Sequence, residues 1–293
     1  MYDTILVPTD GSAAAEAAAR HAIDLARAFD SELVFLSVVE EGVLSRALGD
    51  VDPPVGERRE KLEQAAREAV EALQGLAATS NGGAVRTTVE RGRPHETILD
   101  VADRHDADLI AMGTHGRTGL DRVLLGSVTE RVVRTSDVPV LTARADSASD
   151  GAVEAVLLPT DGSEAATAAV DHGIAIAERY GATVHVLSVI DIGALAGASS
   201  IGMSVPDVVE DLEATHEEAV ETIADRCERG GLDARTHVEQ GTPHRSIREY
   251  VDAEGIDLVT MGTHGRTGFD RFVLGSVTDR VIRTSSAPVL TVR

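Results

Sequence analysis

The chain has 293 residues, which suffices for two ordinary domains, because a typical domain has about 100–200 residues. Apolar residues make up 43% of the chain and aromatic residues only 2%, so its cores must be built mainly from Ala, Val, Leu and Ile. The net charge of −22 repels nucleic acid and anionic lipid, and no apolar run approaches the about 18 residues of a membrane-spanning helix, so neither nucleic acid nor a membrane is expected as a partner.

In chain order, the first half alternates predicted strands with predicted helices. Short apolar runs predict strands at 3–9, 32–39, 84–90, 107–112 and 138–142. Apolar residues at helical spacing predict helices at about 13–29, 57–78, 94–104 and 127–136. A long loop rich in glycine covers 113–126. Such alternation predicts an α/β fold with a parallel sheet that is covered by helices on both faces.

The second half repeats the first. The sequence ILVPTDGS at 5–12 returns as VLLPTDGS at 156–163. The segments MGTHGRTG at 112–119 and LGSVT at 125–129 return unchanged at 261–268 and 274–278. Three motifs in one order, at nearly one offset, indicate two tandem domains, 1–143 and 153–293, joined by a small and polar linker at 144–152. A segment rich in Gly, Ala and Ser, at about 191–205, is the least predictable part.

Two of these motifs fall at carboxyl ends of predicted strands, where open parallel sheets bind their ligands. The third begins a helix at Gly126-Ser127, where free backbone N–H groups and the helix dipole attract an anion, and Ser127 and Thr129 add hydroxyl groups. The spacing Gly-x2-Gly-x9-Gly-Ser starts at Gly113 and again at Gly262. It predicts a phosphate site in each half, although a plain turn would explain either copy alone. Neither a P-loop nor a dinucleotide-binding fingerprint after the first strand is present.

The pattern resembles the universal stress protein domain, whose ATP-binding members carry Gly-x2-Gly-x9-Gly-Ser/Thr. The resemblance covers nearly the whole chain, as two domains. It implies two tandem Rossmann-like domains, each with a five-stranded parallel sheet of order 3-2-1-4-5 flanked by helices, in which the first and fourth strands are neighbours. It also implies an ATP site in each domain, with AMP or ADP as alternatives and Mg²⁺ bridging the phosphates.

Carried over by position, the resemblance implies adenine contacts at Asp10, Val38, Asp161 and Val189. It implies further nucleoside contacts at Pro8, Thr9, Met112, Gly113, Pro159, Thr160, Met261 and Gly262. It implies phosphate contacts at Gly116, Gly126, Ser127, Val128, Thr129, Gly265, Gly275, Ser276, Val277 and Thr278. The two valines are equally well explained as core residues, and the serines before them, Ser37 and Ser188, stand where members of the family often have His.

Other polar side chains of the glycine loops have weaker assignments. Arginines there could reach phosphates, but exposed Arg is often only solvated; they are Arg117, Arg122, Arg266 and Arg271. His115 and His264 have no evident nucleophile or carboxylate partner in the sequence, so we predict no catalytic residue. The ten His residues lack metal-ligand spacing, so no metal site made of protein ligands is expected.

These observations favour an ATP-binding protein of stress response or regulation that acts through nucleotide-dependent conformation or partner binding. A weak ATPase or nucleotidyl-transfer enzyme is the first alternative, because phosphoryl transfer needs mainly positioning and charge stabilisation. An AMP-binding or structural module is the second. The resemblance also implies that the halves pair through their fifth strands, at 138–141 and 288–291, and it leaves a homodimer and a protein partner open.

A cytoplasmic location is expected from two features of the chain. The first eight residues run directly into a strand pattern without the marks of a signal peptide, and Cys227 is the single cysteine, so no intramolecular disulfide can form. Lys61 is the only lysine. This acidic, lysine-poor composition resembles that of proteins from a halophilic archaeon, although an ordinary acidic protein is the alternative.

Overall fold

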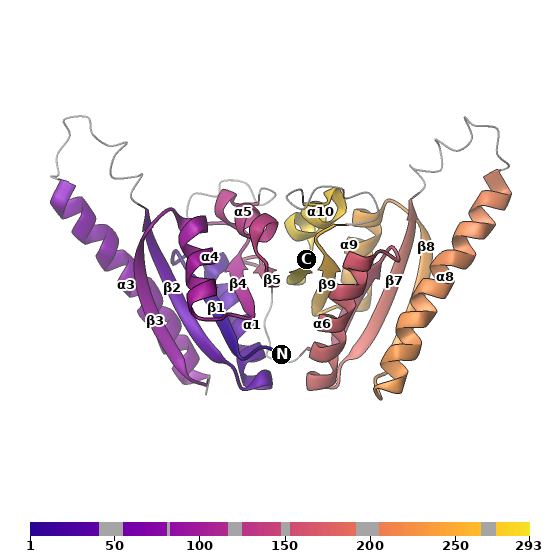
Figure 1. Cartoon of the computed structure of the whole chain (residues 1–293), viewed down its shortest axis with the longest axis horizontal. Helices are drawn as coiled ribbons and strands as arrows, with labels where there is room; N and C mark the ends of the chain where they lie inside the picture. The colour runs from indigo at the N-terminus through magenta and orange to yellow at the C-terminus, as the bar shows by residue number, and fades with distance from the viewer. Residues whose placement is uncertain (41–54, 81–82, 117–124, 148–152, 192–204, 265–273) are drawn as a thin grey trace. The chain divides into compact units, whose positions relative to one another are not determined.

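The computed structural model describes residues 1–40, 55–80, 83–116, 125–147, 153–191, 205–264 and 274–293. Contacts divide the chain into two compact units, Met1–Gly151 (unit 1) and Ala152–Arg293 (unit 2), which Figure 1 colours along the chain. Among the helices of the described ranges, none combines the length and the apolar character needed to cross a membrane.

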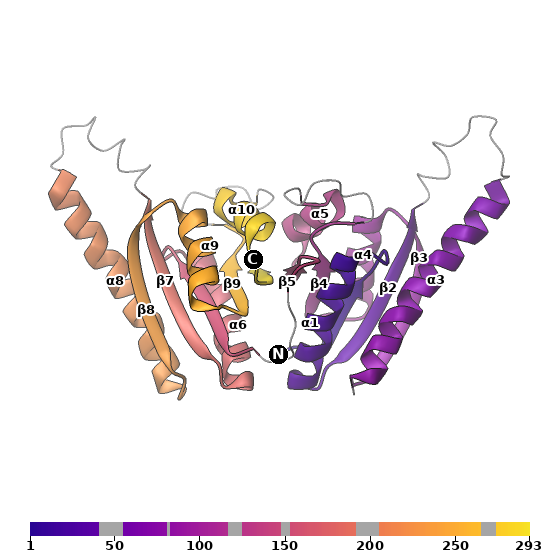
Figure 2. The ribbon, with the colours of Figure 1, turned by 180° about the vertical axis from the view of Figure 1, so that it is seen from behind.

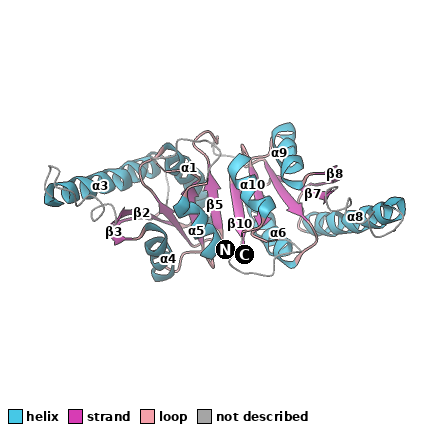
Figure 3. Cartoon of the chain, turned by 90° about the horizontal axis from the view of Figure 1, so that it is seen from above, coloured by secondary structure: helices cyan, strands magenta, loops and turns pink. Residues whose placement is uncertain are grey.

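Unit 1 alternates strands and helices throughout. Its elements are β1 (Thr4–Pro8), α1 (Ala13–Phe29), β2 (Glu32–Glu40), α3 (Val55–Thr79), β3 (Val85–Gly92), α4 (Pro94–Arg104), β4 (Leu109–Gly113), α5 (Ser127–Thr135) and β5 (Val140–Ala143). The strands are parallel and lie in the order β3-β2-β1-β4-β5. Seen from above, α1 and α3 cover one face of this sheet and α4 and α5 the other (Figure 3).

Unit 2 repeats the arrangement. Its elements are β6 (Ala155–Thr160), α6 (Glu164–Tyr180), β7 (Thr183–Asp191), α8 (Val205–Arg229), β8 (Ala234–Gly241), α9 (Pro243–Glu254), β9 (Leu258–Gly262), α10 (Ser276–Thr284) and β10 (Val289–Val292). The strand order is β10-β9-β6-β7-β8. Counted along its own chain, each unit therefore has the order 3-2-1-4-5 that the resemblance implies. Figures 1 and 2 show α3 lying along β2 and β3, and α8 along β7 and β8.

Small and branched apolar residues form the core of each unit, as the composition predicts. Every residue of β4 is buried, and the buried face of α1 consists of seven alanines with Ile23 and Leu25. Small side chains let this helix approach the sheet closely. The predicted elements match the observed ones to within a few residues at their ends. The ends of an element are its least well defined part, because helix termini fray and the sequence pattern fades there.

One carboxylate at the amino-terminal edge of each sheet fixes the first strand beside the fourth. Asp108, just before β4, accepts hydrogen bonds from the backbone N–H groups of Asp3 at 2.7 Å and Thr4 at 3.0 Å. Asp257 accepts the same pair of bonds in unit 2, from Glu154 and Ala155. This adjacency of first and fourth strands brings the carboxyl ends of both strands to one place.

Candidate functional site

In unit 1, the turn after β1 touches the loop after β4. The hydroxyl of Ser12, the N-cap of α1, accepts a hydrogen bond from the N–H of Ala15 and donates one to the carbonyl of His115, both at 3.3 Å. Asp10 Oδ1 accepts the N–H of Ser12 at 3.0 Å, and Thr9 Oγ1 accepts that of Gly11. The first two motifs of the sequence therefore lie in direct contact.

Close packing explains two of the motif glycines. A Cβ atom on Gly113 would lie 2.6 Å from the backbone of Ala14 and Ala15, because the first turn of α1 packs directly against the end of β4. A Cβ atom on Gly116 would lie 2.7 Å from Asp10 Oδ2. Glycine at these positions lets the protein's own segments meet, so its presence is not by itself evidence for a bound phosphate.

The N-terminus of α5 is attached to the same place. The N–H of Gly126 donates to the carbonyl of Thr114 at 2.7 Å. The buried hydroxyl of Thr129 donates to the carbonyl of Gly113 at 2.7 Å. The N-cap, Gly126, has no side chain that could cap the first turn of α5, and Ser127 is exposed. The first turn thus presents backbone N–H groups and the Ser127 hydroxyl, whereas the Thr129 hydroxyl, expected as a further donor to an anion, is engaged within the protein.

Unit 2 repeats the bonds at the start of this helix. Thr278 Oγ1 donates to the carbonyl of Gly262, and the N–H of Gly275 donates to that of Thr263, both at 2.8 Å. The turn after β6 is held by the side chains of Thr160 and Asp161 as its counterpart is in unit 1. Several expected phosphate contacts lie outside the described residues: Arg117, Arg122, Gly265, Arg266 and Arg271.

The expected adenine contacts lie side by side at the strand ends. Pro8, the last residue of β1, is paired with Leu36, so continuing this register by two residues brings Asp10, just after β1, level with Val38 on β2. The pairing of Thr160 with Ser188 gives Asp161 and Val189 the same relation. Val38 and Val189 are only half-buried, so part of each remains available to a ligand. Of the eight expected nucleoside contacts, all but the half-buried Pro159 are buried: Pro8, Thr9, Met112, Gly113, Thr160, Met261 and Gly262.

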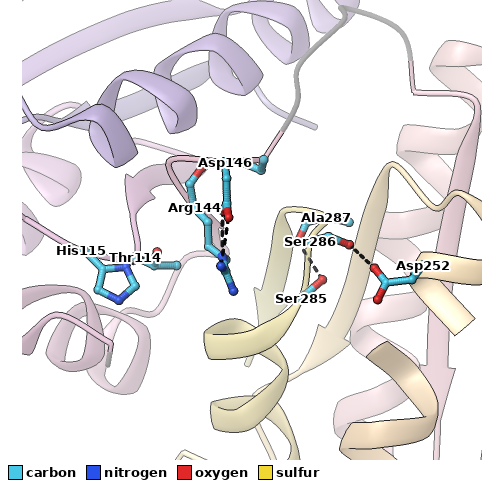
Figure 4. A network of polar contacts seen from close by, with 9 residues as sticks. Thr114, His115, Arg144, Asp146, Asp252, Ser285, Ser286 and Ala287 are labelled. Carbon is cyan, nitrogen blue, oxygen red and sulfur yellow. Dashed lines mark hydrogen bonds and ion pairs between the residues drawn. The ribbon is translucent and has the colours of Figure 1, made fainter. Parts of the chain in front are cut away.

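The loop histidines make local contacts. His115 Nδ1 lies 2.8 Å from the hydroxyl of Thr114 (Figure 4), and His264 repeats this contact with Thr263 at 2.9 Å. In unit 2, partial burial and then the cationic Arg280 of α10 lower the pKa of His244 at the start of α9. Within the described ranges, no group of three or more acidic, His or Cys side chains could hold a metal ion.

Figure 4 also shows polar contacts beyond the motifs, each within one unit. Arg144, just after β5, forms an ion pair with Asp146 at 3.0 Å. The hydroxyl of Ser286 donates to Asp252 at 2.7 Å, and that of Ser285 to the carbonyl of Ala287 at 2.9 Å. These contacts stabilise the segments around β5 and before β10 and touch no residue expected to bind a nucleotide.

One buried side chain next to the site of unit 2 was missed by sequence reasoning. His216 on α8 hydrogen-bonds to Ser188, which in turn bonds to Thr160. An alignment of the two halves would have revealed His216 as a difference between them, because α3 and α8 have equal length and Ala66 of α3 stands at the position of His216. A single His in an amphipathic helix carries no local pattern that would reveal such a contact.

Comparisons with known proteins agree with this architecture. The model of the universal stress protein family matches residues 1–144 and 153–293. A universal stress protein of Mycolicibacterium smegmatis is 31% identical over 301 residues, which cover 99% of this chain and 96% of its own. Universal stress protein MJ0531 of Methanocaldococcus jannaschii is 35% identical over 138 residues, 47% of this chain and 81% of its own.

A solved universal stress protein of Archaeoglobus fulgidus has the same fold, with a TM-score of 0.74 at 24% identity, over 100% of this chain and 99% of that one. The repeat, the common strand order and the family match over both halves lead to one conclusion. The chain belongs to the universal stress protein family and carries two of its domains in tandem.

Proposed function

We propose that each domain binds one ATP and that the chain acts in stress response or regulation through nucleotide-dependent conformation or partner binding. The observation that carries this proposal is the meeting of three motifs at one strand end: Asp10 and Ser12 contact the loop of His115 and Gly116, and Gly126 is bonded to Thr114. The same contacts around Thr263 and Gly275 support a second site.

The proposal assigns each part of a nucleoside triphosphate to one group of these residues. Asp10 and Val38 would contact the adenine, and the end of β4 at Met112 and Gly113 would carry the ribose. The phosphates would then reach the first turn of α5, where N–H groups and the helix dipole stabilise negative charge. Mg²⁺ commonly binds through phosphate oxygens with few protein ligands, so the proposal assigns it no protein ligand set. AMP or ADP would use the same nucleoside contacts.

We propose that the two domains are residues 1–143 and 153–293, joined by a linker at 144–152. We further propose that the protein is cytoplasmic and that its domains pair through their fifth strands, at 138–141 and 288–291. Both segments contain or begin with Pro, which is typical of edge strands because Pro lacks a backbone N–H.

A carboxylate placed where the phosphates would lie tests the proposal. Ser127 and Ser276 are exposed first residues of their helices. Ser127→Asp and Ser276→Asp suit a helix N-terminus, so the fold should persist, but their charge repels phosphate. We expect calorimetric titration with Mg-ATP to give two sites in the wild type and one in each single variant. In the double variant, affinity at both sites should fall by more than about tenfold.

Ser127→Asn with Ser276→Asn is the matched control, because Asn has nearly the shape of Asp without its charge. This double Asn variant should still bind Mg-ATP at two sites. Loss of binding in the Asn pair as well, or full binding in the Asp pair, would place the phosphates elsewhere. A wild type without any nucleotide binding at the same salt concentration would leave a structural module as the better account. Phosphate release measured in the same samples identifies a weak ATPase, if multiple turnovers occur and disappear in the Asp pair.

A further inference from the structure

A chain of hydrogen bonds in unit 2 connects helix α8 to the strand end at the proposed nucleotide site. Ser188 Oγ on β7 lies 2.7 Å from the carbonyl oxygen of Thr160, the last residue of β6, and 2.8 Å from Nδ1 of His216 on α8. Thr160, Ser188 and His216 are all buried. The residue after Thr160 is Asp161, which the proposed function assigns to the adenine.

Hydrogen-bond chemistry fixes the direction of this chain. A hydroxyl carries one hydrogen, and a carbonyl oxygen can only accept. Ser188 must therefore donate to Thr160, and His216 must donate its Nδ1–H to Ser188. The imidazole is held with Nδ1 protonated. The three buried atoms of these two bonds are Thr160 O, Ser188 Oγ and His216 Nδ1, and each has a partner, which removes the cost of burying it unpaired.

Unit 1 has no counterpart of the His216 Nδ1–H donor that completes these hydrogen bonds in unit 2. Ser37 on β2 corresponds to Ser188, and Ala66 stands at the position of His216 in a helix of the same 25-residue length. An alanine side chain cannot donate a hydrogen bond. The strands differ at the same place, because β6 includes Thr160 whereas β1 ends one residue earlier, at Pro8.

We propose that His216 is a positioning residue that makes the two nucleotide sites unequal, with the tighter site in unit 2. This rests on the proposed function. His216 orients the Ser188 hydroxyl toward the Thr160 carbonyl and so fixes the backbone beside Asp161 before a ligand arrives. A strand end that is already ordered loses less conformational freedom on binding, and that difference adds to affinity. In unit 1 the turn after β1 keeps its own hydrogen bonds but has no such link to helix α3, because Ala66 stands at the position of His216.

The test isolates one site at a time in the full-length chain. Ser127→Asp leaves the site of unit 2, and Ser276→Asp leaves that of unit 1. In the Ser127→Asp background, His216→Leu should raise the Kd for Mg-ATP by about five- to tenfold, the effect of one lost buried hydrogen bond. His216→Asn should restore the Kd to within about twofold, because its amide nitrogen can donate from nearly the position of Nδ1. In the Ser276→Asp background, His216→Leu should leave the Kd unchanged.

Hydrogen exchange of the ligand-free protein separates positioning from a general loss of stability. His216→Leu should accelerate exchange in the turn after β6, at 160–163, and not throughout unit 2. Equal Kd values for His216→Leu and the unsubstituted chain would overturn the proposal while leaving nucleotide binding intact. So would a His216→Asn variant as weak as His216→Leu. If the unsubstituted chain binds no nucleotide, the proposed function itself fails and this inference falls with it.

Discussion

Tyr2 is a fully buried aromatic residue whose ionisation the fold opposes. Its ring packs edge-on against Phe29 with 5.0 Å between the ring centroids. Burial, and then the nearby carboxylate of Asp108, raises the pKa of the Tyr2 phenol well above its ordinary value of 10.0. The folded state therefore keeps the phenol neutral at a pH where the unfolded chain already loses the proton, so stability falls as the pH rises above about 10.

Tyr2→Phe should remove part of this loss. Between pH 9 and pH 11 the free energy of unfolding of unit 1 should fall by about 1.4 kcal/mol less in the variant than in the wild type, as measured by urea titration. Few other groups titrate in this range, because the chain has three Tyr, one Lys and one Cys. The two proteins should show parallel behaviour between pH 7 and pH 9. An equal fall in both proteins above pH 9 would contradict the assignment.

At the scale of elements, the two units solve one packing problem differently. A Cβ atom on Gly173 of α6 would lie 2.2 Å from Leu158 Cδ2, in a side chain that is itself fully buried. The corresponding residues of unit 1 are Ala22 on α1 and Val7 on β1. One unit thus combines Gly with Leu and the other Ala with Val, which conserves the volume between helix and sheet.

Gly173→Ala should therefore destabilise unit 2 by about 1–2 kcal/mol, although Ala favours helix formation by about 1 kcal/mol over Gly. Gly173→Ala with Leu158→Val, the pair found in unit 1, should recover most of this loss. Gly75→Ala is the matched control, because nothing lies within 4 Å of a Cβ atom there. It should stabilise α3 by about 0.5–1 kcal/mol. Thermal unfolding measures all three, and a Gly173→Ala variant as stable as the wild type would contradict the packing argument.

At the scale of the whole molecule, the net charge of −22 opposes compaction. Most ion pairs of the described residues are at least partly exposed and contribute little. Raising NaCl from 0.1 M to 1 M shortens the Debye length from about 10 Å to about 3 Å. We expect the thermal midpoint to rise by several degrees, since each kcal/mol of relieved repulsion corresponds to about 2–4 °C in domains of about 150 residues.

KCl should act as NaCl does, because screening depends on ionic strength and not on the identity of the cation. A midpoint that stays constant or falls over this range would show that the acidic surface does not limit stability. A rise is the result that the net charge of −22 leads us to expect. The same screening would weaken the repulsion between an acidic surface and a nucleotide, so affinities of different variants need one fixed salt concentration.

The sequence by itself determined the features that local patterns encode. The alternation of strands and helices predicted the parallel α/β fold, and the two copies of the motif near Gly113 and Gly262 predicted a repeated domain. These inferences hold because periodicity reports which face of an element is buried, and because identical segments fold alike. The resemblance then supplied the strand order, which periodicity alone does not contain.

Only the tertiary structure decided which side chains meet. It directs the Thr129 hydroxyl to Gly113 rather than toward a ligand, and it explains Gly113 by the packing of α1. It also joins His216 to Ser188, 28 residues away in the chain. Such contacts depend on strand register and on the path of a crossover helix, which are set by the packing of the whole domain and leave no periodic trace in the sequence.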